Sequence, residues 1–133
     1  MDNKTNSLKI INSLIKFLNE GFDSKKSLEM TAKELKLSEK KIEEVNKNVL
    51  YDGINSLIIF INLFINQEMK TFNSKDFKKL RVNEKIRFLI LSRLKIIDEF
   101  FDRKLIFKLV VKQKSISKAG VMLFNVSDEI WHL

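Results

Sequence analysis

Residues 31–48, TAKELKLSEKKIEEVNKN, have the pattern of two helices joined by a tight turn. Lys36 stands at the expected turn, where glycine is usual in such motifs. Ser38 can cap the following helix, because its hydroxyl oxygen can accept from a free backbone N–H. Ala32 is small enough to let the two helices cross closely, and Val45 follows where an apolar side chain would close the core between them. The stretch therefore predicts a helix-turn-helix.

Apolar residues recur at helical spacing on both sides of this motif, which indicates further amphipathic helices. The chain has 133 residues, no proline and three glycines, so helices can run without internal breakers and an all-β fold is disfavoured. We expect one all-α domain over residues 1–133, with a helix-turn-helix subdomain at 6–48 and a bundle of the ligand-binding type at 52–133. The helices expected outside the motif cover residues 6–20, 52–69, 82–97, 105–111 and 118–133, and Ser24 or Ser27 is expected to cap the first helix of the motif.

The helix-turn-helix lacks the electrostatic character of a DNA reader. Residues 27–48 carry five bases and five acids, none of the bases is an arginine, and the second helix should expose Glu39, Glu43 and Glu44. Carboxylates that face a polyanionic backbone without compensating arginines weaken binding. We therefore expect this element to be structural, and nucleic acid is not an expected partner.

The excess positive charge lies in the second half of the chain. The formal net charge is +8, and residues 69–118 carry fifteen bases and five acids. Three interpretations remain open for this basic stretch. The first is a solvated surface whose lysines reflect codon usage. The second is a surface that attracts anionic lipid headgroups, and the third is a surface that binds nucleic acid non-specifically.

Residues that carry enzymatic or metal chemistry are scarce. The chain has no cysteine, which excludes thiol catalysis and disulfides, and its one histidine, His132, has no second histidine or cysteine nearby. No phosphate-binding glycine loop, nucleophile motif or catalytic carboxylate pair is visible. We expect no catalytic residue, no metal and no enzymatic activity. The N-terminus lacks a signal-peptide pattern and the apolar run at 54–65 is too short to span a bilayer, which favours the cytoplasm.

Three sequence blocks, in order, resemble one known family. They are GFDSKKSLEMTAKELKLSEKKI at 21–42, LRVNEKIRFLILSRLKII at 80–97 and VSDEIWHL at 126–133. Together they resemble the accessory family of ubiquinone biosynthesis whose members have a TetR-like fold. The resemblance covers the chain from Ile10 to Leu133. Phe22 departs mildly from the tryptophan that usually follows the glycine of the first block.

The resemblance implies a fold, a ligand and partners. It implies a TetR-like helical bundle, usually a homodimer, that does not act as a repressor and is not an enzyme. A hydrophobic pocket in its second half would hold an isoprenoid quinone intermediate or another lipid, and no other cofactor is implied. The protein would lie against the inner membrane as a peripheral protein and present the lipid to the di-iron demethoxyubiquinone hydroxylase.

The resemblance also implies an incomplete C-terminus. Family members continue beyond the tryptophan that matches Trp131 with a further amphipathic helix, whereas this chain stops at Leu133. The family's contacts with the hydroxylase and the membrane lie in that continuation, so lipid binding is the property this chain is expected to keep. Two alternatives stay open: a TetR-type DNA-binding regulator, and a truncated remnant without function.

The candidate site residues are mostly aromatic. The lipid-pocket candidates are Phe60, Phe64, Phe88, Leu91, Leu123, Phe124 and Trp131. Phenylalanine at helical spacing also fits plain core packing, and Trp131 fits a core anchor for the last helix. Arg93 lies on the apolar face of its helix, and a buried arginine needs a partner, so we expect a structural ion pair with Asp128 or Glu129.

Overall fold

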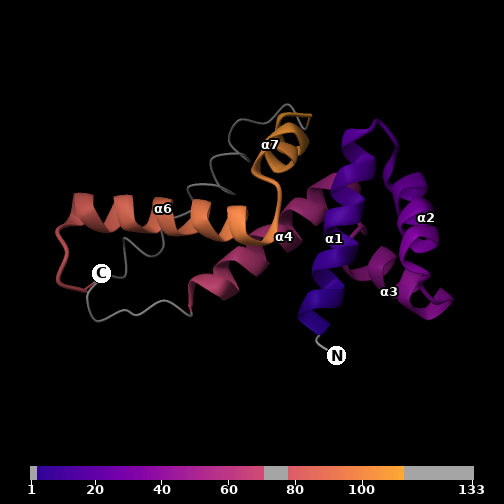
Figure 1. Cartoon of the computed structure of the whole chain (residues 1–133), viewed down its shortest axis with the longest axis horizontal. Helices are drawn as coiled ribbons and strands as arrows, with labels where there is room; N and C mark the ends of the chain where they lie inside the picture. Colours follow the sequence, from indigo (N-terminus) through magenta and orange to yellow (C-terminus); the bar gives the residue numbers. More distant parts are fainter. Residues whose placement is uncertain (1–2, 71–77, 113–133) are drawn as a thin grey trace.

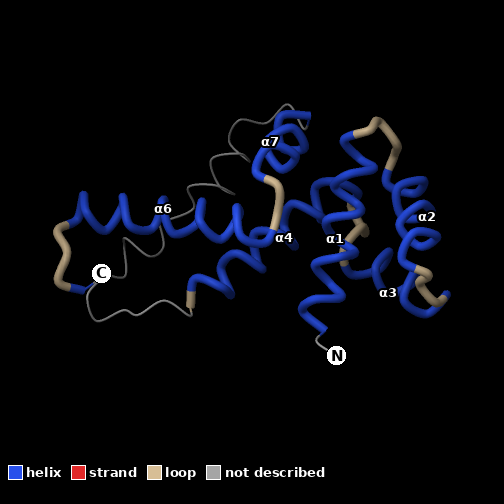
Figure 2. Tube along the Cα trace, in the orientation of Figure 1, coloured by secondary structure: helices blue, strands red, loops and turns tan. Residues whose placement is uncertain are grey.

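The computed structural model describes residues 3–70 and 78–112, and every regular element within these ranges is a helix (Figure 2). The expectation of an all-α protein is confirmed. The helices are α1 (Asn3–Asn19), α2 (Ser24–Leu35), α3 (Glu39–Asn48), α4 (Gly53–Met69), α6 (Val82–Phe100) and α7 (Arg103–Lys112). The expected helix at 118–133 lies outside the described residues, and the single-domain boundaries stay a prediction.

Helices α1, α2 and α3 cluster at one end of the molecule, and α4 runs out from that end (Figure 1). Helix α6 crosses α4 with its C-terminal half, while its N-terminal half extends beyond the cluster. Phe101 and Asp102 then turn the chain so that α7 returns to pack against α1. The last described helix therefore contacts the first one.

The helix-turn-helix expected from residues 31–48 is present, and its boundaries follow local capping chemistry. Lys36 ends α2 in the left-handed conformation, with φ at 55°, and its N–H donates to the carbonyl of Ala32. Ser38 caps α3 by accepting from the N–H of Lys41 at 3.2 Å, as predicted. The prediction of a serine cap for α2 is wrong. Asp23 stands one residue before the helix and its carboxylate accepts from the N–H of Lys26 at 2.8 Å.

Every described helix contributes apolar side chains to the core. Helices α2 and α3 contribute only from their inward faces. Its most deeply buried part is formed by side chains of α1, α4, α6 and α7. The fully buried apolar residues there are Leu14, Ile15, Leu57, Ile61, Ile65, Ile97, Ile106, Leu109 and Val110. One face of α4 is left outside the core, because Ile59 and Leu63 are exposed.

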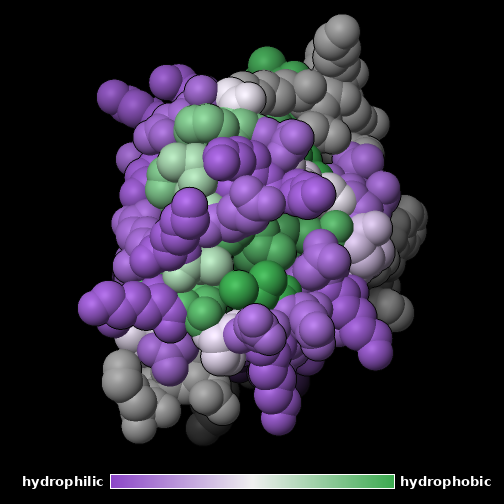
Figure 3. All heavy atoms as spheres, turned by 90° about the vertical axis from the view of Figure 1, so that its right-hand side faces the viewer, coloured by the Kyte–Doolittle hydropathy of each residue, from purple (hydrophilic) through white to green (hydrophobic). Residues whose placement is uncertain are grey.

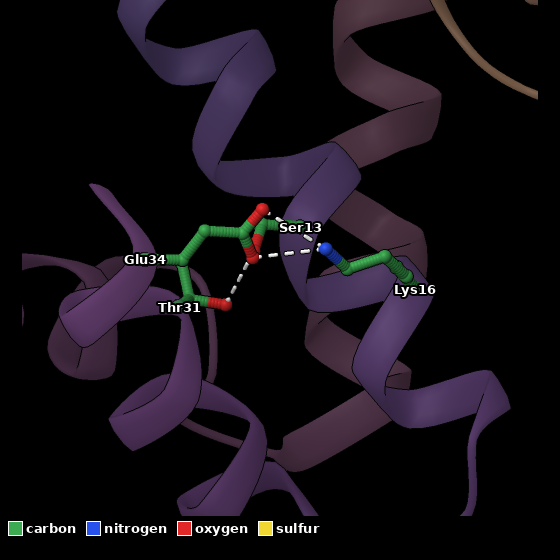
Figure 4. Close-up of polar contacts among 4 residues, drawn as sticks. All are labelled: Ser13, Lys16, Thr31 and Glu34. Atoms are coloured by element: carbon green, nitrogen blue, oxygen red, sulfur yellow. Dashed lines mark hydrogen bonds and ion pairs between the residues drawn. The ribbon is translucent and has the colours of Figure 1, made fainter.

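A polar cluster fastens α1 to α2 (Figure 4). Ser13 and Thr31 are buried, and their hydroxyl oxygens lie 3.0 Å apart. Ser13 also donates to the Glu34 carboxylate at 3.1 Å, and the Lys16 ammonium lies 2.9 Å from both oxygens of that carboxylate. The hydrogen bond from Lys16 is the main cause that lowers the pKa of Glu34 below its ordinary value of 4.5.

Two asparagines on the other side of α1 tie it to the end of the described chain. Asn12 donates to the carbonyl of Phe100 at 3.0 Å, and Asn19 donates to the carbonyl of Leu105 at 3.1 Å. The Phe100 carbonyl lies in the last turn of α6, where backbone acceptors lack helical partners, and Leu105 lies in the first turn of α7. Helix α1 therefore fixes α2 on one side and the corner on the other.

Candidate functional site

An apolar groove runs between α1 and α4 and is closed at one side by the α6–α7 corner. Its volume is about 320 Å³, and exposed surface within it is mainly apolar. The apolar lining comes from Leu8, Ile11, Phe60, Phe64 and Phe101, and the polar lining comes from Lys4, Ser7, Gln67 and Glu68. A groove with apolar walls and few polar groups has the composition of a small-ligand site, at the lower end of the usual size range of roughly 300–1,000 Å³.

Aromatic packing gives this groove a rigid wall. The ring of Phe64 meets the rings of Phe100 and Phe101 edge to face, with centroids 5.2 and 5.6 Å apart. Edge-to-face contacts of this kind are a preferred geometry for aromatic rings and add to the energy of apolar burial. The wall therefore joins residues from α4 and from the α6–α7 corner into one surface.

Charged groups of the groove lie together at one end. The Lys4 ammonium lies 2.5 Å from the Glu68 carboxylate and 4.7 Å from the centre of the Phe100 ring. The Glu68 side chain is the more buried of the pair, with an exposed fraction of 16%. The groove thus has one charged end and apolar walls along the rest of its length. This distribution is complementary to an amphiphilic ligand, which has a polar end and an apolar chain.

A second hollow of about 120 Å³ adjoins this groove and extends it toward α3. The two share Ser7, Ile11 and Phe60 as lining residues. Val45 and Val49 add apolar walls on the α3 side of the second hollow. Ser7 and Phe60 therefore stand at the junction of the two hollows, where a side chain of a different size would alter both.

Of the predicted pocket residues, the structure brings Phe60 and Phe64 together in the groove. Phe88 and Leu91 do not line this groove, since Phe88 is half-buried elsewhere on α6 and Leu91 is 53% exposed, and their assignment to a lipid pocket stays a prediction. The reason is helical phase: Arg93 faces α4, and Leu91, two residues earlier, points away from that contact. Leu123, Phe124 and Trp131 lie outside the described residues.

Other lining residues were missed as site residues. Leu8 and Ile11 belong to the apolar face of α1, whose periodicity predicts core rather than a site. Phe101 ends α6, and sequence alone does not place that corner beside α1. The signal that could have identified the corner is the pair of asparagines on α1, which bind its carbonyls.

Arg93 is fully buried, as its place on an apolar face predicted. Its guanidinium donates to the side-chain carbonyl oxygens of Asn66 at 2.6 Å and Asn62 at 2.5 Å. These two residues lie one turn apart on α4 and face α6. The expected partners Asp128 and Glu129 lie outside the described residues, so the ion pair stays a prediction. The asparagine partners were missed, although their spacing on an otherwise apolar helix marks them.

The surface of the helix-turn-helix carries mixed charge. Lysines and glutamates are both exposed on α3, and Lys41 pairs with Glu44 at 3.7 Å. Figure 3 views the end of the molecule that carries α2 and α3, where hydrophilic side chains cover most of the face and an apolar strip shows between them. This surface has no continuous basic footprint of the kind that grips phosphates.

Residues 3–70 and 78–112 contain no group of three or more His, Asp or Glu side chains placed to hold a metal ion. No single described helix has both the length and the apolar composition of a membrane span. Helices α3 and α4 have that length and composition only when they are taken together, and the chain bends by 88° between them.

The sequence matches no family model, and no curated protein or solved structure is significantly similar to it. The family resemblance therefore stays a prediction, and the groove is the feature of the described residues on which a functional proposal can be based.

Proposed function

We propose that this protein is a non-enzymatic lipid-binding accessory protein, and that the α1–α4 groove holds the apolar chain of its ligand. The single observation that carries the proposal is the groove itself, with five apolar side chains along its walls and its charges gathered at one end. Each ligand methylene that enters such a site contributes about 0.8 kcal/mol by leaving water. The charged end would keep the ligand's polar group at the surface.

The resemblance to the accessory family of ubiquinone biosynthesis supports a more specific form of the proposal. An isoprenoid quinone intermediate combines a polar ring with a long apolar chain, so one end would lie near Lys4 and Glu68 and the chain would follow the aromatic wall. On this proposal the fold is TetR-like, the active species is a homodimer, and the partner is the di-iron hydroxylase of the late pathway.

Solvent extraction of the purified protein, followed by mass spectrometry, tests the proposal. We expect a quinone-like or other long-chain lipid at close to one molecule per chain. A folded preparation, verified by circular dichroism, that releases no such molecule and takes up none from added isoprenoid quinone would contradict it.

A second candidate function is DNA binding by the helix-turn-helix, and the formed α2–turn–α3 unit favours it. The charge of α3 opposes it. The helix carries three lysines and three glutamates, so its side chains have no net positive charge that would attract DNA. A gel-shift titration with mixed duplex DNA at low salt separates the two. We expect no shift at protein concentrations that saturate the lipid site.

A further inference from the structure

A third hollow lies between the start of α1 and the α2–α3 turn, at the right-hand end of the molecule in Figure 1. Its volume is about 590 Å³, which is larger than that of the groove and within the usual range of roughly 300–1,000 Å³ for small-ligand sites. It shares no lining residue with the α1–α4 groove, and it shares only Ile10 and Lys41 with the second hollow. It is therefore a separate feature that the lipid-binding proposal does not use.

Lysines supply the charge of this hollow. Lys9 on α1, Lys36 in the turn and Lys41 on α3 line it, and none of its described lining residues is a carboxylate. Lys41 is partly compensated, because its ammonium lies 3.7 Å from the Glu44 carboxylate. Within the described residues, Lys9 and Lys36 make no ion pair. The hollow therefore carries positive charge that no acidic side chain of its own walls balances.

The rest of the lining matches a ligand that is more than a bare ion. Ile10, Leu35 and Leu37 give the hollow apolar walls, and Asn6 and Ser38 add groups that can donate hydrogen bonds. An inorganic anion would contact the lysines and leave the apolar walls in water. A phosphate ester with an organic part would use both kinds of surface.

The backbone of Lys36 is a second observation in favour of a ligand. Its φ is 55°, in the left-handed region that glycine adopts more easily than any residue with a side chain. A strained residue that stands where glycine is usual is a reason to ask what its side chain does. Here the side chain lines the hollow and contributes one of its three cations.

We infer that this hollow binds a soluble phosphate ester with two or three phosphate groups and an apolar organic part, the class to which nucleoside diphosphates and triphosphates belong. The ammonium groups of Lys9, Lys36 and Lys41 contact the phosphate oxygens, because lysine binds phosphate as a point charge. The organic part packs on Leu35 and Leu37. The inference goes beyond the proposed function, because it concerns another site and another class of ligand.

A small ligand agrees with the surrounding charge better than a DNA duplex does. A duplex needs a basic surface that follows its backbone over several phosphates, and Glu39, Glu43 and Glu44 are exposed on α3 beside the same turn. The three lysines instead line a single concave site. That arrangement matches the few phosphates of one small molecule.

Isothermal titration calorimetry of the full chain tests the inference, with ATP, adenosine and inorganic phosphate as probes and without divalent cations. We expect ATP to bind at about one molecule per chain and to weaken as salt rises. Adenosine and inorganic phosphate should each bind at least about 10-fold more weakly than ATP, because each offers only one of the two kinds of contact. No binding of ATP, or equal affinity for inorganic phosphate, would overturn the inference.

Lys36→Gly separates binding from folding. It removes one cation of the hollow and relieves the left-handed backbone, so ATP affinity should fall by about 5-fold or more while the urea midpoint rises. Lys33→Ala is the matched control, because Lys33 is an exposed lysine of α2 that does not line the hollow. Its ATP affinity should stay within about 2-fold of that of the unchanged chain. Unchanged affinity in Lys36→Gly, or an equal loss in both variants, would contradict the proposed site.

Two further measurements separate this site from the others. Lys9 and Lys36 line neither the groove nor the second hollow, so Lys9→Ala and Lys36→Gly should both keep their lipid while losing ATP affinity. Loss of lipid and ATP together would show that the two ligands use one site and would overturn the inference. A short DNA duplex that binds more tightly than ATP and displaces it would also overturn it, because the lysines would then serve a nucleic acid.

Discussion

The α1–α2 contact and the α4–α6 contact both bury polar groups, but they do so in different ways. Between α1 and α2, Ser13 and Thr31 are neutral hydroxyls, and the charged pair Lys16–Glu34 stays at the surface. Between α4 and α6, the charge itself is buried, because Arg93 lies fully inside. A surface ion pair is screened by water and contributes little, whereas a buried guanidinium depends on every hydrogen bond that it makes.

The two contacts should therefore lose different amounts of stability when a polar group is removed. The helix-turn-helix end is assembled from caps and local hydrogen bonds, each contributing about 1 kcal/mol. The α4–α6 contact depends on a few groups far apart in sequence, so the loss of either partner should have a large effect.

Replacement of both Arg93 acceptors should be the most damaging change. Asn62→Leu with Asn66→Leu removes two hydrogen bonds from a guanidinium that is fully buried. We expect the free energy of unfolding to fall by about 3–5 kcal/mol in urea denaturation. Addition of Arg93→Met should restore part of that loss, because the buried charge disappears. A triple variant less stable than the double variant would contradict the interpretation.

Truncation of an apolar side chain on α4 should separate its buried face from its exposed face. Ile61 is 0% exposed, and Ile61→Ala should lower the free energy of unfolding by about 2–4 kcal/mol through lost burial and a residual cavity. Ile59 on the same helix is 50% exposed, and Ile59→Ala should cost less than about 1 kcal/mol. Similar losses at the two positions would show that a further partner covers Ile59.

Relief of backbone strain in the turn should stabilise the helix-turn-helix. Lys36 occupies the left-handed region, which costs a residue with a side chain about 1 kcal/mol relative to glycine. Lys36→Gly should therefore raise the free energy of unfolding by up to about 1 kcal/mol. Lys33→Gly, in the last turn of α2, should instead lower it by up to about 1 kcal/mol, because glycine weakens a helix. Thermal and urea unfolding of both variants give the comparison.

Acidification should weaken the α1–α2 contact through Glu34. Its pKa is lowered in the folded protein, so its contribution to stability is present above pH 4.5 and is lost as the pH falls through the folded pKa. Glu34→Gln should make the stability of the protein less dependent on pH below 4.5. Glu43→Gln, at an exposed position of α3, provides the control and should leave the acid limb unchanged. Urea midpoints measured between pH 3 and pH 6 would detect the difference.

Local chemistry explains how much of this molecule could be predicted from sequence. The Ser38 cap, the turn at Lys36 and the extent of α4 depend on neighbours within a few residues, so composition and spacing were sufficient. The cap of α2 was misassigned because Asp23 and two nearby serines all have side chains that can cap a helix. Which of them does so depends on where the backbone turns helical, and that is at Ser24.

The candidate site was predictable only in part, because it depends on contacts between distant segments. Phe60 and Phe64 were found because they share a face of α4, one turn apart. Leu91 lies away from this groove because the rotation of α6 is set by Arg93 meeting Asn62, which no periodicity reveals. Phe101 joins the groove because the α6–α7 corner is held by side chains of α1, and that contact spans most of the chain.

The most direct test of the central claim compares lipid bound by three forms of the full chain: unchanged, Ser7→Trp and Thr5→Trp. Ser7 lines both hollows of the groove, so a tryptophan there should fill it, whereas Thr5 is exposed on α1 and lines neither. After solvent extraction and mass spectrometry, we expect near-stoichiometric lipid from the unchanged chain and from Thr5→Trp, and a loss of about 10-fold from folded Ser7→Trp. Equal lipid content in all three forms would contradict the claim that the α1–α4 groove is the binding site.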